Sequence, residues 1–251
     1  MQDEAKVVII TGGSRGLGAS AARECARRGM GVILTYNANP EAAARVVASI
    51  GAEGGKAVAL ALDVAVSASF SAFRERVREV LRETWQREDF DVLVNNAGYG
   101  LYAPIVDVSE QQFDSLYNVH LKGPFFLTQT LLPRMVDGGQ IINITSATTR
   151  VATAGVAPYA SFKGGLEVLT RYLAKELGAR RIRANSISPG AIRTDLGGGL
   201  TPELETMLAA QTALGRVGEP GDIGAAVAAL IADDSRFINA QSIEIAGGYA
   251  I

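Results

Sequence analysis

Tyr159 and Lys163 lie four positions apart, in the segment Tyr-Ala-Ser-Phe-Lys. In a helix this spacing puts the phenol and the ammonium group on the same face. The pKa of a free phenol is about 10, and a nearby cation lowers it by favouring the ionised form. The pair could therefore act as a general acid or base near neutral pH. The same spacing is also common on solvent-exposed helix faces.

The stretch from residue 6 to residue 18 could bind the phosphates of a nucleotide. A short β-branched run, Val7 to Ile10, predicts a strand that is buried on both faces. Thr-Gly-Gly-Ser-Arg-Gly-Leu-Gly follows at residues 11–18, ahead of a helical pattern. Such a turn brings free N–H groups and the positive end of a helix close to a pyrophosphate. An ordinary tight turn between a strand and a helix is the alternative.

Strand-like and helix-like segments alternate along the whole chain, and these elements must position the reactive groups. The expected strands cover residues 7–10, 31–36, 57–62, 91–94, 140–145, 182–188 and 242–245. The expected helices include residues 41–50, 70–85, 109–135, 158–177 and 221–232, with a bend or break at Pro124. This order predicts an α/β fold with a doubly wound, mostly parallel seven-stranded sheet and helices on both faces. We expect one domain over residues 1–251.

Polar residues and turn residues follow several of these strands directly. Thr11, Asp63, Asn95, Ser146 and Pro189 all lie at or just after an expected strand end. Ligands of such sheets bind beyond the carboxyl ends of the strands. We therefore expect these five residues to line one cleft.

Composition excludes several classes of function. A formal net charge of −2 over 251 residues gives no basic surface for nucleic acid or anionic lipid. No apolar run approaches the length of a membrane span, and no leader segment is evident, so we expect a cytoplasmic protein. One cysteine and one histidine give no metal-ligand cluster. We interpret Cys25 as a buried apolar residue and His120 as a packing or hydrogen-bonding residue.

The ordered set of motifs resembles the short-chain dehydrogenase/reductase family over nearly the whole chain. The glycine stretch, Asp63-Val64, the Asn-Asn-Ala-Gly run at 95–98, Asn118, Ser146, the Tyr159–Lys163 segment and Pro189-Gly190 follow the family order and spacing. The resemblance implies hydride transfer between a nicotinamide cofactor and a carbonyl or alcohol substrate.

The same resemblance assigns roles to four catalytic residues. Tyr159 would protonate the carbonyl oxygen or deprotonate the alcohol, and Ser146 would hydrogen-bond that oxygen. Lys163 would hold the nicotinamide ribose and lower the pKa of Tyr159, and Asn118 would keep a water in a proton path behind Lys163. Ser146 could instead serve only as a cap at a strand end.

The resemblance also implies a set of cofactor contacts. Asp63 and Val64 would flank the adenine. Asn95, Ala97 and Gly98 would line the adenosine side. Pro189, Gly190, Ile192 and Thr194 would hold the nicotinamide. The implied cofactor residues are Thr11, Gly12, Ser14, Arg15, Gly16, Leu17, Gly18, Asn37, Asp63, Val64, Asn95, Ala97, Gly98, Tyr159, Lys163, Pro189, Gly190, Ile192 and Thr194. Asn95 could instead chiefly tie neighbouring strands together.

The choice of cofactor can be argued from two positions. An acidic residue at the end of the second strand would bind the adenosine ribose and repel a 2′-phosphate, but residues 34–37 read Leu-Thr-Tyr-Asn. Ser14 and Arg15 offer a hydroxyl group and a cation, which suit a phosphate. We therefore expect NADP(H) to be preferred over NAD(H). A solvated Arg15 without a ligand is the alternative.

The substrate is not named by the sequence. The family pattern places the pocket after residue 98, after Ser146 and beneath a lid at about residues 191–211. A small-molecule carbonyl or alcohol is the general expectation, and a 3-oxoacyl carrier-protein reductase is one alternative. Asp137 lies where a basic residue would suit an acidic carrier, whereas Arg180 and Arg181 favour the carrier. A nucleotide-sensing protein without turnover is a second alternative.

Two further features concern packing and assembly. Residues 81–90 make the segment before the fourth strand a few residues longer than the family pattern, and Trp85 there could pack internally or mark an interface. The helices at 109–135 and 158–177 and the C-terminal run 242–251 are apolar enough to predict contacts between subunits. We therefore expect a homotetramer, largely on the strength of the resemblance.

Overall fold

The computed structural model of the chain describes residues 5–251. Seven strands form one sheet in the order β3 (Ala57–Ala61), β2 (Gly31–Tyr36), β1 (Val7–Ile10), β4 (Phe90–Asn95), β5 (Met135–Ile144), β6 (Arg183–Pro189) and β7 (Ser242–Ile245). Every neighbouring pair is parallel. The predicted α/β fold is confirmed, and its sheet is parallel throughout rather than mostly so.

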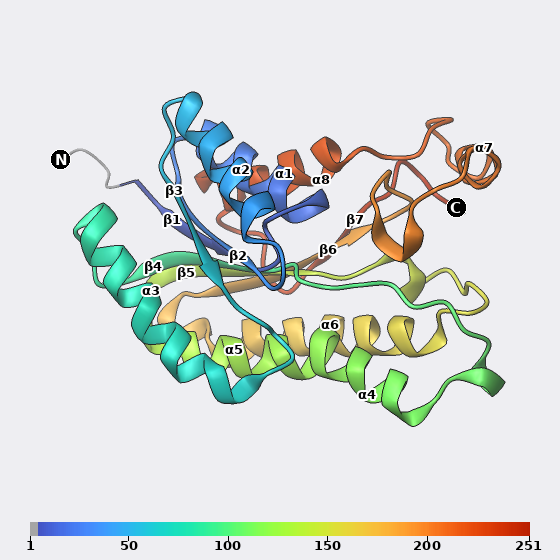
Figure 1. The fold of residues 1–251 in the computed structure, drawn as a ribbon, viewed down its shortest axis with the longest axis horizontal. Coiled ribbons are helices and arrows are strands. Elements are labelled where there is room, and N and C mark those ends of the chain that lie inside the picture. The colour runs from blue at the N-terminus through green and yellow to red at the C-terminus, as the bar shows by residue number, and fades with distance from the viewer. Residues whose placement is uncertain (1–4) are drawn as a thin grey trace.

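Helices cover both faces of the sheet (Figure 1). One face carries α1 (Gly16–Arg27), α2 (Pro40–Ala52) and α8 (Pro220–Ile231). The other carries α3 (Phe70–Trp85), α4 (Glu110–Tyr117), α5 (Gly123–Leu131) and α6 (Ala157–Glu176). A shorter helix, α7 (Pro202–Ala210), lies beyond the strand ends at the right of Figure 1. The strand order reverses between β1 and β4, which marks the ligand-binding edge of such sheets.

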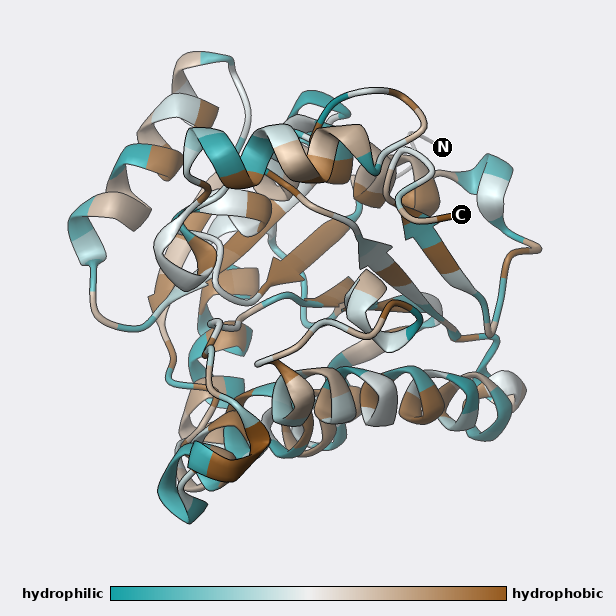
Figure 2. Ribbon diagram, turned by 90° about the vertical axis from the view of Figure 1, so that its right-hand side faces the viewer, coloured by the Kyte–Doolittle hydropathy of each residue, from teal (hydrophilic) through white to brown (hydrophobic). Residues whose placement is uncertain are grey.

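The core lies in two layers, one on each face of the sheet. Successive residues of β1 point to opposite faces, so Val8 and Ile10 belong to the cluster under α1 and α8, whereas Val7 and Ile9 belong to the other. All four side chains are fully buried. Figure 2 shows the strands as mainly hydrophobic ribbons between helices of mixed character. Burial on both faces explains why β1 is a continuous apolar run.

The helix expected at 109–135 is interrupted, as expected, but the interruption precedes Pro124. Ser109 begins α4 with a reciprocal capping box to Gln112, and α4 ends at Tyr117. A π-helical turn follows over Asn118–Lys122, and α5 then begins at Gly123, with Pro124 in its first turn. Proline is tolerated there because the first helical N–H groups have no partner within the helix. A 3₁₀ turn ends the segment, and β5 begins at Met135, before the expected start at 140.

The extra residues before β4 pack into the fold. The indole of Trp85 lies over Gly31 at the start of β2, where a Cβ atom would come within 2.4 Å of the indole Nε1. Arg87 pairs with Asp91 at 2.8 Å, and the Asp91 carboxylate also accepts from the backbone N–H of Val7 at 2.7 Å. Trp85 therefore packs internally and joins the end of α3 to the sheet.

Candidate active site

The amino-terminal part of α6 brings Tyr159 and Lys163 together, as the spacing predicts. Lys163 is only 4% exposed, and its Nζ donates a hydrogen bond to the backbone carbonyl of Ile144 at 2.7 Å. The same Nζ lies 5.6 Å from the centroid of the Tyr159 ring. The lysine is therefore tied to the end of β5, with its charge beside the tyrosine.

Burial controls the proton affinity of both groups. It lowers the pKa of Lys163 to about 8, because the interior disfavours the ammonium form. It also raises the pKa of Tyr159, and a hydrogen bond with Ser146 acts in the opposite direction with a smaller effect. The resemblance predicted that Lys163 lowers the pKa of the Tyr159 phenol. In the folded chain this pKa is instead raised, because desolvation has the larger effect. A protonated phenol at neutral pH suits proton donation.

Ser146 directly follows β5 in extended backbone. Its Oγ accepts from the backbone N–H of Thr148 at 3.3 Å and from the Thr148 hydroxyl at 2.9 Å. The serine therefore does cap the short turn Ala147–Thr149, which was the alternative interpretation. Because it also hydrogen-bonds Tyr159, capping and a place in the site occur together.

Asn118 and His120 both belong to the π-helical turn, two positions apart. The Asn118 carbonyl accepts from the N–H of Gly123, which closes the turn. Residues two apart on a helix differ in direction by roughly 200°. His120 faces Tyr159, with ring centroids 5.0 Å apart in an edge-to-face arrangement. Asn118 is half-buried, and among residues 5–251 its side chain makes no hydrogen bond.

His120 packs and forms a hydrogen bond, as its interpretation predicts, but it does so beside Tyr159. It is 1% exposed, and its Nε2 lies 2.9 Å from the backbone carbonyl of Tyr99. A Cβ atom at Gly98 would lie 2.8 Å from His120 Cε1, so the imidazole fills the space in front of this glycine. Burial, and then the charge of Lys163, lower the pKa of His120 to about 3. A lone histidine between two motif residues is the signal that could have indicated it.

Hydrogen bonds with residues that follow β4 fix the shape of the glycine turn after β1. The Oγ1 of Thr11 accepts from the N–H groups of Asn96 and Ala97 at 2.9 and 3.0 Å. The Asn96 side chain donates to the carbonyls of Thr11 and Gly12 at 2.8 and 3.3 Å. A Cβ at Gly18 would lie 2.4 Å from the Gly12 carbonyl oxygen, so only glycine fits there. Asn96, which the predicted set omits, therefore shapes the turn.

The open side of this turn faces the loop after β6. Gly16 has φ +53°, and the only atom within 4 Å of a Cβ built on it is Cγ2 of Thr194, at 3.9 Å. In the same loop, Gly190 packs against Ala246 and its N–H donates to the carbonyl of Ile245 at 3.2 Å. Two predicted cofactor segments, the glycine turn and the loop after β6, therefore come close together here.

Asp63, Val64 and Asn95 lie at the same edge. The Asp63 carboxylate accepts from the N–H of Ala65 at 2.9 Å, and Val64 is buried. The Asn95 amide donates to Asn143 Oδ1 at 2.9 Å and to Thr128 Oγ1 at 3.2 Å. Asn95 therefore links β4 to β5 and to α5, which is the role that its alternative interpretation expects. The residue is only 4% exposed, so little of it is accessible to a ligand.

The remaining predicted positions differ in exposure. Arg15 and Asn37 are exposed, and Ser14 and Leu17 are half-buried. The Gly12 N–H donates to Thr35 Oγ1 at 3.2 Å, which keeps the turn against the end of β2. Arg15 and Asn37 are thus free to meet a ligand on the outer side of the turn.

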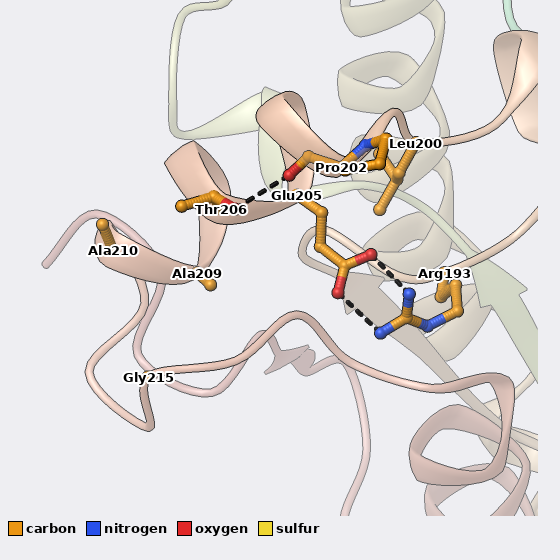
Figure 3. Close-up of a pocket in the computed structure, with 8 residues that line it drawn as sticks. All are labelled: Arg193, Leu200, Pro202, Glu205, Thr206, Ala209, Ala210 and Gly215. Atoms are coloured by element: carbon orange, nitrogen blue, oxygen red, sulfur yellow. Dashed lines mark hydrogen bonds and ion pairs between the residues drawn. The ribbon is translucent and has the colours of Figure 1, made fainter.

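The expected lid consists of the loop after β6 and α7, a helix that the sequence analysis did not predict. Arg193 pairs with Glu205 of α7 at 2.7 Å and with Glu219, the cap of α8, at 2.9 Å. Figure 3 shows Arg193 paired with Glu205. Both side chains help to line a hollow of about 670 Å³ together with other residues of α7. A Cβ at Gly100 would lie 3.3 Å from Gly197, so the lid touches the loop after β4.

The other groups that could do chemistry are few. Within the part of the chain that the structure describes, no cluster of three or more His, Cys, Asp or Glu side chains could hold a metal ion. Cys25 is fully buried, and burial raises the pKa of its thiol to about 12, so it stays protonated. No helix among residues 5–251 is long and apolar enough to cross a membrane.

This arrangement matches known proteins along nearly its whole length. A family model described as enoyl-(acyl carrier protein) reductase matches residues 12–250. The chain belongs to the short-chain dehydrogenase/reductase family. Membership confirms the resemblance and shows that the chain is an oxidoreductase of the class that acts on carbonyl and alcohol groups.

Three similar proteins illustrate the range of relatives of this short-chain dehydrogenase/reductase. An uncharacterised oxidoreductase of Methylorubrum extorquens is 37% identical over 248 residues, which cover 98% of each protein. The 3-oxoacyl-[acyl-carrier-protein] reductase FabG of Staphylococcus epidermidis is 35% identical over 97% of this chain and 98% of that protein. The solved structure of the angucycline C-6 ketoreductase LanV with bound NADP has a TM-score of 0.94 at 35% identity, over 98% of this chain and 95% of LanV.

Proposed function

We propose that this short-chain reductase uses NADPH to reduce the carbonyl group of a small molecule, with Tyr159 as the proton donor. The observation that carries the proposal is the buried Lys163 with the half-buried Tyr159 beside it, close to Ser146. The raised pKa of Tyr159 keeps a proton available for the forward reduction.

Each residue then has one task in the proposed reduction. The nicotinamide, when bound, supplies a hydride to the carbonyl carbon. Ser146 donates a hydrogen bond to the carbonyl oxygen and keeps it near the phenol. Tyr159 gives that oxygen a proton, which completes the alcohol. Lys163 binds the ribose hydroxyls and, with a pKa of about 8, carries the positive charge that stabilises the tyrosinate left behind.

The preference for NADPH rests on the exposed side of the glycine turn. Arg15 and Asn37 are free there, and no carboxylate follows β2 before α2 begins at Pro40. A guanidinium group binds a 2′-phosphate well, and the repulsion that an acidic residue would cause is missing. LanV, which is 35% identical, was solved with bound NADP, in agreement with this choice.

The substrate is proposed to be a free apolar ketone. Apolar side chains border the lid region: Tyr102 is 73% exposed, Leu196 51% and Met207 50%. A second LanV structure holds NADP and rabelomycin, at 35% identity. Apolar walls around a few fixed polar groups are typical of sites for such ligands.

The alternative of a 3-oxoacyl carrier-protein reductase is supported by the FabG relative but weakened by one contact. Arg180 donates to Asp137 at 2.8 Å and to the carbonyl of Leu132 at 2.9 Å. Its charge is therefore neutralised and its guanidinium is occupied, so it offers little to an acidic carrier. A sensor without turnover would have no use for a buried lysine and phenol, which are expensive to retain.

The proposed assembly is a homotetramer in the cytoplasm. Apolar side chains are exposed on α4, α5 and α6, including Phe113, Phe125 and Tyr172 at 44%, 44% and 63%. Phe237, before β7, and Ile251, after it, are also exposed, at 101% and 94%. Two surfaces of this kind on one chain suit an assembly with two-fold axes.

The test of the proposed reaction is a Tyr159→Phe variant. We expect its kcat for ketone reduction with NADPH to fall by about 10²- to 10⁴-fold, because the proton donor is lost. NADPH binding, measured by fluorescence titration, should change by no more than a few-fold. Tyr172→Phe is the matched control, since Tyr172 is exposed on the same helix. Near-normal turnover by Tyr159→Phe would disprove the mechanism.

The cofactor preference has its own test. The ratio of kcat/KM for NADPH to that for NADH should exceed one and should fall by about tenfold in Arg15→Ala, because a charge-assisted hydrogen bond to the 2′-phosphate is lost. Arg28→Ala is the control, since Arg28 is exposed at the far end of α1. Equal use of both cofactors by the unaltered protein would contradict the assignment.

A further inference from the structure

His120 lies between Gly98 and Tyr159 and has no role in the mechanism described so far. On one side, its ring fills the space in front of Gly98, where a Cβ would lie 2.8 Å from Cε1. On the other side, it meets the Tyr159 ring edge-to-face, with centroids 5.0 Å apart. The titratable groups that face it are Tyr99, from the loop after β4, and Tyr159 and Lys163, from α6.

The hydrogen bond of the imidazole defines which nitrogen carries the proton. The partner of Nε2 is the backbone carbonyl of Tyr99, at 2.9 Å, and a carbonyl oxygen can only accept. Nε2 therefore carries the hydrogen. The neutral ring then leaves Nδ1 as a bare acceptor.

This acceptor is buried without a partner. Nδ1 of His120 makes no hydrogen bond with residues 5–251, although the side chain is 1% exposed. An unpaired buried acceptor destabilises a fold unless something else requires it. The groups around this ring include two hydrogen-bond donors, the Lys163 ammonium and the Tyr159 hydroxyl.

We propose that His120 is a positioning residue that holds the Tyr159 ring in place and offers the bare Nδ1 as a hydrogen-bond acceptor to the proton-donating groups of the site. The Tyr99 carbonyl fixes the direction of the ring, and the π-helical turn carries the residue. His120 is therefore the residue of this turn that packs against Tyr159. This inference rests on the proposed function, because it presumes that Tyr159 donates the proton.

Two substitutions separate this role from simple packing. His120→Phe keeps an aromatic edge against Tyr159 but has no acceptor, whereas His120→Asn loses the ring but keeps an amide oxygen close to the position of Nδ1. We expect kcat to fall by about 10- to 100-fold in His120→Phe, with the KM for NADPH within a few-fold, and to fall less in His120→Asn. The solvent deuterium isotope effect on kcat should rise in His120→Phe only. The reverse order of the two variants would show a packing role and would overturn the proposal.

A measurement on the unaltered protein keeps the proposal testable if either variant fails to fold. Because the chain has one histidine, ¹⁵N-labelled histidine gives a single pair of ring nitrogen signals. We expect a protonated Nε2 and a bare Nδ1 from pH 8 down to pH 5, and a shift of the Nδ1 signal when NADPH binds. A proton on Nδ1, or titration near pH 6.5, would overturn the proposal. Failure of the proposed function itself would look different, since the unaltered protein would then reduce no ketone.

Discussion

The buried charge of Lys163 should make the protein less stable than a version without it, by an amount that depends on pH. Burial lowers the pKa of Lys163 from 10.5 to about 8 in the folded chain. The unfolded chain therefore binds more protons between these two values, and stability rises with pH across that window. Below pH 8 both states carry the charge, and the full cost of burying it is present.

The magnitude follows from the two pKa values. Integration gives a cost of about 3 kcal/mol at pH 7 and about 1 kcal/mol at pH 9.5. Lys163→Met removes the charge and nearly conserves the volume. The free energy of unfolding of the variant minus that of the unaltered protein should therefore fall by about 2 kcal/mol between pH 7 and pH 9.5. The loss of the hydrogen bond to Ile144 lowers this difference equally at both pH values, so it does not affect the comparison.

The assay is urea unfolding followed by circular dichroism at several pH values, without cofactor and at one protein concentration. Lys175→Met is the matched control, because Lys175 is exposed on the same helix, and its effect should stay within about 0.5 kcal/mol. The variant at Lys163 should also lose its reductase activity, so stability and activity would change in opposite directions. A difference that does not depend on pH would refute the reasoning.

Two further predictions concern packing and assembly. Gly31→Ala should destabilise the fold by about 1–3 kcal/mol in urea unfolding, because the new methyl group would displace the indole of Trp85. Gly51→Ala, in a helix and with open space around it, should instead be neutral or stabilising by up to about 1 kcal/mol; equal effects of the two would exclude the proposed contact. Light scattering behind a sizing column should give about four times the chain mass of 26.3 kDa. Tyr172→Asp and Phe237→Asp should each reduce that mass to a dimer's, and a monomer in the unaltered protein would rule the tetramer out.

The strands and their order of appearance could be predicted because burial on both faces leaves a clear mark on the sequence. The apolar run of β1 and the glycine turn after it are local features, and the helix that follows begins at Gly16 as the motif requires. The pair of Tyr159 and Lys163 was equally accessible, since one helical turn relates the two residues.

Features that depend on contacts across the fold could not be predicted in this way. Asn96 shapes the glycine turn only because β4 lies beside β1 in the sheet. None of the residues of the lid helix α7 is buried, so its sequence carries no amphipathic pattern that could be detected. Desolvation of Tyr159 likewise depends on the whole fold around it and exceeds the effect that its neighbours in sequence suggest.

The positions of Asn118 and His120 show most clearly where pattern reasoning fails. Both residues occur in one helical segment, and a motif read as letters cannot say which of them faces Tyr159. The π-helical turn decides this, because its closing bond from Gly123 to Asn118 changes the direction of every side chain between them. The imidazole then lies against the phenol, and burial keeps it uncharged beside Lys163. A protonated imidazole at this place would repel the Lys163 ammonium, so a histidine suits the site because it stays neutral there.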